Sequence, residues 1–290
     1  MDASHPARVS SATGAITPDA EPAAVTIRPL TFLPEFQACV ALQQRVWGDG
    51  FSEAVAVSLL QAASYIGGLV IGAYSREETL VGFVFGLTGV KDGRTVHWSH
   101  LLGVLDSARN LGVGRMLKEY QRAELARRGI PEMLWTFDPL IAKNAHLNLT
   151  LLGARVVRYT PNMYGATESP LHHSLPTDRF VVSCATSDIA DRRGAIVLAA
   201  AEAPVLTLEP RPDDLRAEMR DVSERTLRIE LPSDFQHLVG QSPGRAAEWH
   251  AAVRRHFLWA LGNGYVVAGL HRDAVTSRCF YVLTTEPLDA

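Results

Sequence analysis

A glycine-rich turn between an apolar strand and an amphipathic helix is the most constraining feature of this sequence. The stretch SHLLGVLDSARNLGVGRMLKEY, residues 99–120, contains the pattern Arg109-x-x-Gly112-x-Gly114. Glycines at such a junction let backbone amides converge on an anion, and the helix N-terminus adds to that attraction. The third glycine of a dinucleotide fingerprint would fall at Leu117, and no Gly-Lys-Ser or Gly-Lys-Thr is present. The turn is therefore either a phosphate site of another kind or a purely structural tight turn.

The elements around this turn alternate between strands and helices. Apolar patterning and turn residues predict the following series: a strand from residue 25, helices at 34–48 and 52–63, strands at 68–75, 80–90 and 95–104, a helix after the turn, a strand at 132–137, a short helix at 141–152 and a strand at 154–160. Such an order is typical of an α/β layer architecture.

The helix after the turn has one apolar face. The residues at positions i, i+3, i+4 and i+7 of this face are Val113, Met116, Leu117 and Tyr120. Lys118, Arg122 and Arg127 fall outside that face. Gly129 and Pro131 are expected to end the helix.

Two further regions flank this core. Residues 1–24 are rich in Ser, Ala, Pro and Asp, lack the apolar centre of a signal peptide and are expected to form a disordered tail. A Pro-rich stretch at 160–176 is the predicted boundary between a domain at 25–165 and a smaller α+β region at 175–290. In that region we expect these elements: strands near 179–185 and 194–208, helices near 211–220 and 244–262, and a C-terminal hairpin.

Composition excludes several classes of protein. The net charge of −3 argues against a nucleic-acid-binding protein. The longest apolar run, residues 195–206, contains a glutamate and a proline and is too short to span a membrane. Cys39, Cys184 and Cys279 are far apart and predict neither a disulfide framework nor a metal site, so a cytoplasmic location is the default.

The turn and the order of elements together resemble one known family. Arg109-x-x-Gly112-x-Gly114, preceded by LLGVLDS and followed by an amphipathic helix, is similar to motif A of the GNAT superfamily of acyl-CoA-dependent N-acetyltransferases. Within it, the chain looks most like a bacterial group with an S-H-x-L-G-V strand and the motifs FDPL and NMYG. The resemblance covers residues 25 to 165 and implies a GNAT-like mixed sheet with helices on both faces.

The resemblance also implies acetyl-CoA or another acyl-CoA as co-substrate. The turn would hold the coenzyme A pyrophosphate through backbone N–H groups, and the end of the preceding strand would separate from its neighbour and pair with the pantetheine arm. The residues that would bind the co-substrate are Leu102, Gly103, Val104, Arg109, Asn110, Leu111, Gly112, Val113, Gly114 and Arg115. Asn144 and Asn148 are four apart, on one face of the predicted helix, and are either pantetheine ligands or merely exposed.

Amine acylation needs a base, because an alkylammonium ion has no lone pair with which to attack. His100 stands four residues before Val104, the offset at which the arylalkylamine branch of the superfamily has a proton-relaying histidine. Strand alternation would place His100, Leu102 and Val104 on one face and His97 on the other. A structural histidine is the alternative interpretation.

A proton donor for the leaving thiolate is less obvious. Many members of the superfamily use a tyrosine at the position where this chain has Leu149, which cannot donate. Tyr164, in NMYG, is the nearest candidate and Tyr159 the second, although each could simply pack on the sheet. Asp138, where a strand ends, could orient the amine or cap the next helix.

The main functional hypothesis is transfer of an acetyl or other short acyl group to a small amine or amino acid, by direct attack in a ternary complex. Two alternatives stay open: succinyl-CoA-dependent N-succinyl transfer to an amino acid, and an acyl-CoA sensor without catalysis. The C-terminal region would either cover the acceptor site or mediate homodimer formation.

Overall fold

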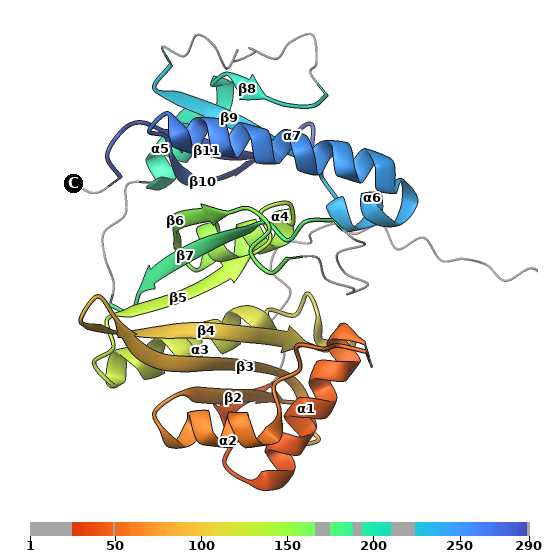
Figure 1. Ribbon diagram of the computed structural model, residues 1–290, viewed down its shortest axis with the longest axis vertical. Helices are drawn as coiled ribbons and strands as arrows, with labels where there is room; N and C mark the ends of the chain where they lie inside the picture. Colours follow the sequence, from red (N-terminus) through yellow and green to blue (C-terminus); the bar gives the residue numbers. More distant parts are fainter. Residues whose placement is uncertain (1–24, 49, 166–174, 188–192, 210–223, 289–290) are drawn as a thin grey trace, which may run out of the picture.

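The described part of the protein contains two β-sheets, seen one above the other in Figure 1. The computed structural model describes residues 25–48, 50–165, 175–187, 193–209 and 224–288. The larger sheet has seven strands in the order β1-β2-β3-β4-β5-β7-β6. Their bounds are β1 Thr26–Pro29, β2 Leu69–Tyr74, β3 Leu80–Lys91, β4 Arg94–Val104, β5 Glu132–Phe137, β6 Arg155–Thr160 and β7 Arg179–Ala185. Only β4 and β5 pair in parallel, so the sheet is mixed.

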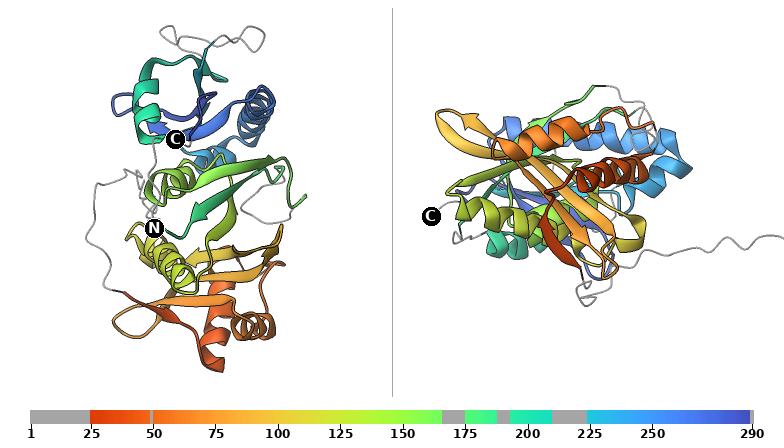
Figure 2. Two further views of the ribbon diagram at one scale, coloured as in Figure 1. Left: turned by 90° about the vertical axis from the view of Figure 1, so that its left-hand side faces the viewer. Right: turned by 90° about the horizontal axis from the view of Figure 1, so that it is seen from below.

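Helices cover both faces of this sheet, as the two views of Figure 2 show. On one face α1 (Leu33–Trp47) and α2 (Val57–Tyr65) bury Phe83 and Phe85 of β3. On the other face α3 (Val113–Arg127) packs through Val113, Leu117 and Leu125 against the apolar side chains of β2, β3 and β5. The short α4 (Ala142–Ala145) and the π-helical η2 (His146–Leu151) pack against the same core. The α/β architecture and its element order up to residue 160 are therefore as the sequence predicts.

Strand β7 changes the expected division of the chain. We assigned the strand near 179–185 to the C-terminal region, but it lies between β5 and β6 in the larger sheet and pairs antiparallel with both. Its insertion satisfies the edge of β5 that faces away from β4. The pairing of β5 with β7 joins residues more than 40 positions apart and leaves no local signal in the sequence.

The smaller sheet has the strand order β10-β11-β9-β8. Its elements are α5 Arg193–Ala199, η3 Ala200–Glu202, β8 Val205–Leu206, β9 Thr226–Leu231, α6 Phe235–Gln241, α7 Pro243–Gly262, β10 Val266–Arg272 and β11 Cys279–Thr284. The helix expected near 244–262 and the C-terminal hairpin are confirmed. The strand expected at 194–208 is wrong, because most of that segment is helical, and the helix expected near 211–220 lies outside the described residues.

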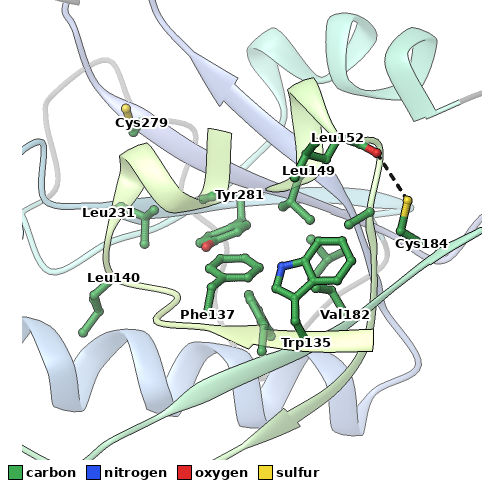
Figure 3. Close-up of a cluster of buried hydrophobic side chains, with 14 of the residues drawn as sticks. Trp135, Phe137, Leu140, Leu149, Leu152, Val182, Cys184, Leu231, Cys279 and Tyr281 are labelled. Atoms are coloured by element: carbon green, nitrogen blue, oxygen red, sulfur yellow. Dashed lines mark hydrogen bonds between the residues drawn. The ribbon is translucent and has the colours of Figure 1, made fainter. Parts of the chain in front are cut away.

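The two sheets share one apolar core. Phe180 of β7 and Phe257 of α7 contact each other with ring centroids 4.8 Å apart, and Tyr281 of β11 lies within 5.4 Å of both. The Tyr281 hydroxyl donates to the carbonyl of Pro139, 2.8 Å away. Figure 3 shows this ring beside Phe137 and Trp135 of β5. The C-terminal unit is thus packed onto the β5 side of the larger sheet.

Gly86 on β3 offers a test of how closely β3 packs against β4. A Cβ at this position would collide with His97 Nε2 and lie 2.7 Å from the carbonyl oxygen of Trp98. We expect Gly86→Ala to lower the free energy of unfolding by about 1–3 kcal/mol, the range for overpacked cores. Gly89→Ala on the same strand is the matched control, because its Cβ would meet nothing within 4 Å. Urea denaturation of both variants measures the difference; equal stabilities would contradict this close approach.

Candidate functional site

Strands β4 and β5 pair only briefly and then separate. Their parallel register joins His97 to Met133 and Trp98 to Leu134, and no further pair follows. Beyond these pairs β4 continues to Val104, bonded to β3 alone, while β5 is bonded to β7. We call the segments 99–104 and 135–137 the fork. The backbone of β4 that faces β5 is left without a strand partner there, as expected for a site that accepts an extended ligand.

A β-bulge lies at the base of the fork. The β3–β4 register steps from Phe85–Leu101 to Gly86–Ser99, so His100 is the extra residue. The expectation that His100 shares a face with Leu102 and Val104 is therefore wrong, because a bulge interrupts the two-residue period of a strand.

The bulge places these side chains on opposite faces of the sheet. Leu102 and Val104 face α3, where they lie 3.7 and 3.9 Å from a Cβ built on Gly114. His100 lies on the α1–α2 face against the Phe85 ring, with ring centroids 6.0 Å apart. His97 faces α3, so the two histidines lie on opposite faces of the sheet, as predicted.

The glycine-rich turn follows the fork directly. Gly112 has a φ of 76° and Asn110 a φ of 62°, so both lie in the left-handed region before α3 begins at Val113. Within the described residues, no chain atom accepts a hydrogen bond from the backbone N–H groups of residues 110–115. These free donors at the N-terminus of a 15-residue helix form an anion-binding surface.

Arg109 links the turn to the end of β4. Its Nε donates to the Val104 carbonyl over 3.3 Å, and its guanidinium is 2.7 Å from the Asp106 carboxylate. Arg115 forms an exposed ion pair with Glu119, one turn further along α3. The structure thus brings the predicted segments 102–104 and 109–115 together at one end of the fork.

Lys118 crosses the base of the fork on the α3 face. The sequence placed it outside the apolar face of α3, yet it is only 3% exposed. Its ammonium donates to Ser99 Oγ over 2.7 Å and lies 3.9 Å from the centre of the Trp135 ring. Ser99 and Trp135 are the first residues of β4 and β5 beyond their last pair. Burial lowers the pKa of Lys118 to about 7. No sequence motif marks this residue, because a lysine on a helix is ordinarily solvated.

A chain of hydrogen bonds fixes the partners of Lys118. The Ser99 hydroxyl donates to Gln121 Oε1 over 2.7 Å, and Gln121 Nε2 lies 3.0 Å from His97 Nε2. Thr88 donates its hydroxyl hydrogen to the Gly67 carbonyl, so its oxygen accepts from His97 Nδ1, 3.0 Å away. His97 is therefore neutral, with its hydrogen on Nδ1. It is a structural histidine and not a candidate base.

This buried histidine makes stability depend on pH. Burial, with the charges of Lys118 and Arg128, lowers the pKa of His97 to about 4. An unfolded histidine has a pKa of about 6.5, so between pH 6.5 and 4 the unfolded chain binds a proton that the folded chain does not. We expect the free energy of unfolding to fall by about 3 kcal/mol over that range because of His97. Urea denaturation at several pH values measures this loss, which should be smaller in His97→Gln; an unchanged slope in that variant would contradict the assignment.

The opposite face of the fork carries a second group of side chains. Thr136 of β5 points to the same face as Trp98, because Trp98 pairs with Leu134 and side chains alternate. The hydroxyls of Thr136 and Tyr164 are 3.0 Å apart. Tyr164 is 40% exposed, so a ligand can reach it. Partial burial lowers the pKa of His100, and the Glu53 carboxylate opposes that change.

Asp138 follows β5 on this side of the sheet. Its carboxylate accepts from the Leu140 N–H over 2.9 Å and lies 3.7 Å from the guanidinium of Arg179. Burial raises the pKa of Asp138, and the positive charge of Arg179 opposes that rise. The guanidinium of Arg179 lies 5.4 Å from the centre of the Tyr164 ring, so the sequence missed an arginine beside two of its candidates.

Two other candidates, Tyr159 and Asn148, have structural partners. Tyr159 donates its hydroxyl to Asp178, which also pairs with Arg254, and burial raises the pKa of Tyr159 well above its ordinary value. Asn148 is buried and accepts from Trp135 Nε1 over 2.8 Å, whereas Asn144 is exposed. The alternative that both asparagines are merely exposed is therefore wrong for Asn148, which lies in the π-helix formed by residues 146–151. Leu149 is buried in the core (Figure 3).

The described residues contain neither a candidate membrane span nor a candidate metal site. No helix in that part of the chain is both long and apolar enough to cross a membrane. No three His, Cys, Asp or Glu side chains within it are grouped as metal ligands would be. The three cysteines are buried thiols without a disulfide.

Comparisons with known proteins identify similar solved structures only. No family model matches the sequence, and no curated protein sequence is significantly similar to it. The ribosomal-protein-S18-alanine N-acetyltransferase from Escherichia coli is 17% identical with a TM-score of 0.45, over 58% of this chain and 97% of that one. The aminoglycoside 6'-acetyltransferase type Ii is 18% identical with a TM-score of 0.45, over 57% of this chain and 99% of that one. An acetyltransferase of the GNAT family from Streptococcus pneumoniae is 17% identical with a TM-score of 0.45, over 56% and 99%. A large part of this chain therefore lies outside each match.

Proposed function

We propose that this protein is an acyl-CoA-dependent N-acyltransferase that moves an acetyl or other short acyl group to a small amine or amino acid. One observation carries the proposal: an unpaired strand edge, at 99–104, leads directly into a turn with a row of free backbone N–H groups, at 110–115. An extended ligand with amides in its arm and a pyrophosphate at one end matches both features. Coenzyme A is such a ligand.

The proposed binding mode uses backbone groups. The pyrophosphate would lie on the N–H groups of the turn, where the helix dipole of α3 favours negative charge. The pantetheine arm would lie along Leu102, Gly103 and Val104, pairing with β4 as a short strand does. The Arg109 guanidinium, already tied to the end of β4, would stand beside the phosphates.

The thioester would then lie at the base of the fork. Unpaired N–H groups of β4 near the bulge could donate to the oxyanion, a contribution of about 3 kcal/mol per donor. His100 faces the α1–α2 side of the fork and is proposed as the base for the acceptor amine. Asp138 is proposed to orient that amine, with Tyr164 beside it.

The acyl group is proposed to pass directly to the amine. An acyl-enzyme intermediate on cysteine would need a reactive thiolate, but the three thiols are buried, and burial raises the pKa of each. An acyl-CoA sensor is a second candidate function, favoured by the buried leucine at position 149.

Calorimetric titration with acetyl-CoA tests the proposal. We expect saturable binding, and much weaker binding of ADP, which carries a pyrophosphate but no pantetheine arm. Absence of binding at millimolar acetyl-CoA would overturn the proposal. Thiol release from acetyl-CoA and succinyl-CoA with a panel of amines and amino acids then separates an enzyme from a sensor, which would bind without turnover.

A further inference from the structure

Lys118 is a buried cation for which the described part of the fold supplies no counter-ion. Among the described residues, no carboxylate forms an ion pair with its ammonium. Its contacts are the Ser99 hydroxyl and the face of the Trp135 ring. The titratable groups near it on other elements are His97 of β4, held neutral, and the Cys184 thiol of β7. Burying an unpaired ammonium is costly, so a group retained in this state commonly serves a ligand or a reaction.

The position of this ammonium relates it to the fork. It bridges the first unpaired residue of each strand, Ser99 and Trp135, on the face that α3 covers. His100 lies at the same level of β4 on the opposite face. A cation and a candidate base therefore flank the place where the two strands separate.

We propose that Lys118 is the proton donor to the sulfur of coenzyme A as it leaves, which rests on the proposed acyl transfer. The pantetheine arm would enter from the α3 side, so its sulfur would lie nearest to Lys118, whereas the amine would approach from the His100 side. When the tetrahedral adduct collapses, the carbon–sulfur bond breaks and its electron pair goes to sulfur. The Lys118 ammonium gives that sulfur one proton and becomes a neutral amine, which solvent reprotonates. The proton lost by the acceptor amine leaves through His100.

The surroundings of Lys118 suit this role. A pKa lowered to about 7 gives an acid that transfers its proton readily to a thiolate and recovers it near neutral pH. The hydrogen-bond chain from Ser99 to Gly67 aims the Ser99 oxygen at the ammonium. The Trp135 ring is held by the hydrogen bond that its Nε1 donates to Asn148. Lys118 would thus supply the proton that Leu149 cannot.

Coenzyme A itself is the probe that tests the proposal, because it needs no acceptor. The thiolate of bound coenzyme A absorbs in the ultraviolet, so its thiol can be titrated in the complex and compared with free coenzyme A in the same buffer. Lys118 is charged below its own pKa of about 7, so the comparison is made at pH 6. There a cation within about 4–6 Å should raise the thiolate fraction of bound coenzyme A about tenfold above that of free coenzyme A. In Lys118→Met the rise should vanish, while Lys91→Met, an exposed lysine on β3, should behave as wild type.

Each outcome of this titration bears on the proposal. A thiolate fraction at pH 6 in wild type that is unchanged or lowered on binding overturns it, even if Lys118→Met does not fold. A raised thiolate fraction that persists in Lys118→Met also overturns it. If Lys118→Met weakens the binding of succinyl-CoA but not that of coenzyme A, and the bound thiol is unaltered, the ammonium binds an acyl carboxylate. That result would also overturn the proposal. No binding of coenzyme A at all is a failure of the proposed function, and the inference about Lys118 falls with it.

Discussion

Replacement of Gly112 by aspartate is expected to abolish the binding of acetyl-CoA. Gly112 has a φ of 76° and lies within the row of free N–H groups at 110–115. Aspartate would add a carboxylate beside the place proposed for the pyrophosphate, and a Cβ to a backbone conformation that L-residues rarely adopt. We expect a loss of at least about 100-fold in affinity, or about 3 kcal/mol. Calorimetry at millimolar ligand measures it.

Two control variants separate charge from backbone strain. Gly129→Asp places the same residue at a φ of 70°, at the other end of α3, and a Cβ there also meets nothing within 4 Å. It should cost similar stability and leave the affinity for acetyl-CoA unchanged. Gly112→Asn keeps the shape of aspartate without its charge and should lose much less affinity. Wild-type affinity in folded Gly112→Asp would contradict a phosphate site at this turn.

The sequence predicted what depends on local patterns. The turn, the amphipathic α3 and the order of strands up to β6 follow from glycine placement and apolar periodicity, and the structure has them. The separation of β4 from β5 was expected only from the family resemblance, and it lies where that resemblance placed it, before residues 102–104.

Other features depend on pairing between distant segments. The bulge at His100 is visible only when β4 is aligned on β3, so alternation assigned Leu102 and Val104 to the wrong face. The burial of Lys118 depends on Ser99 and Trp135, which come from two other strands. The insertion of β7 beside β5 likewise has no signature in either strand alone.

The assignment of His100 as base predicts the largest kinetic effect. His100→Ala should lower the rate of acyl transfer at pH 7 by about 10²–10⁴-fold, the usual range for a lost general base. Its affinity for acetyl-CoA should stay nearly unchanged, because the proposed contacts to coenzyme A come from 102–104 and 109–115. The measurement is single-turnover acylation of whichever amine gives turnover in the panel, with calorimetry for affinity.

The pH dependence of the rate is a second test of His100 as the base. A base acts in its neutral form, so the rate should rise with pH through the pKa of His100. Because burial lowers that pKa, the midpoint should lie below about 6.5, the value of an unperturbed histidine. Deprotonation of the amine also raises the rate with pH, but it does so near pH 10 for an alkyl amine and in every variant. Only the lower limb should disappear in His100→Ala.

His97 supplies the matched control for this prediction. It lies three residues away on the same strand, faces α3 and is bonded to Thr88 and Gln121. His97→Gln should therefore change stability and leave the lower pH limb of the rate in place. If folded His100→Ala turns over normally at pH 7, His100 is a structural residue against Phe85. Asp138 would then be the remaining candidate base, since burial raises the pKa of its carboxyl towards the range in which a base works.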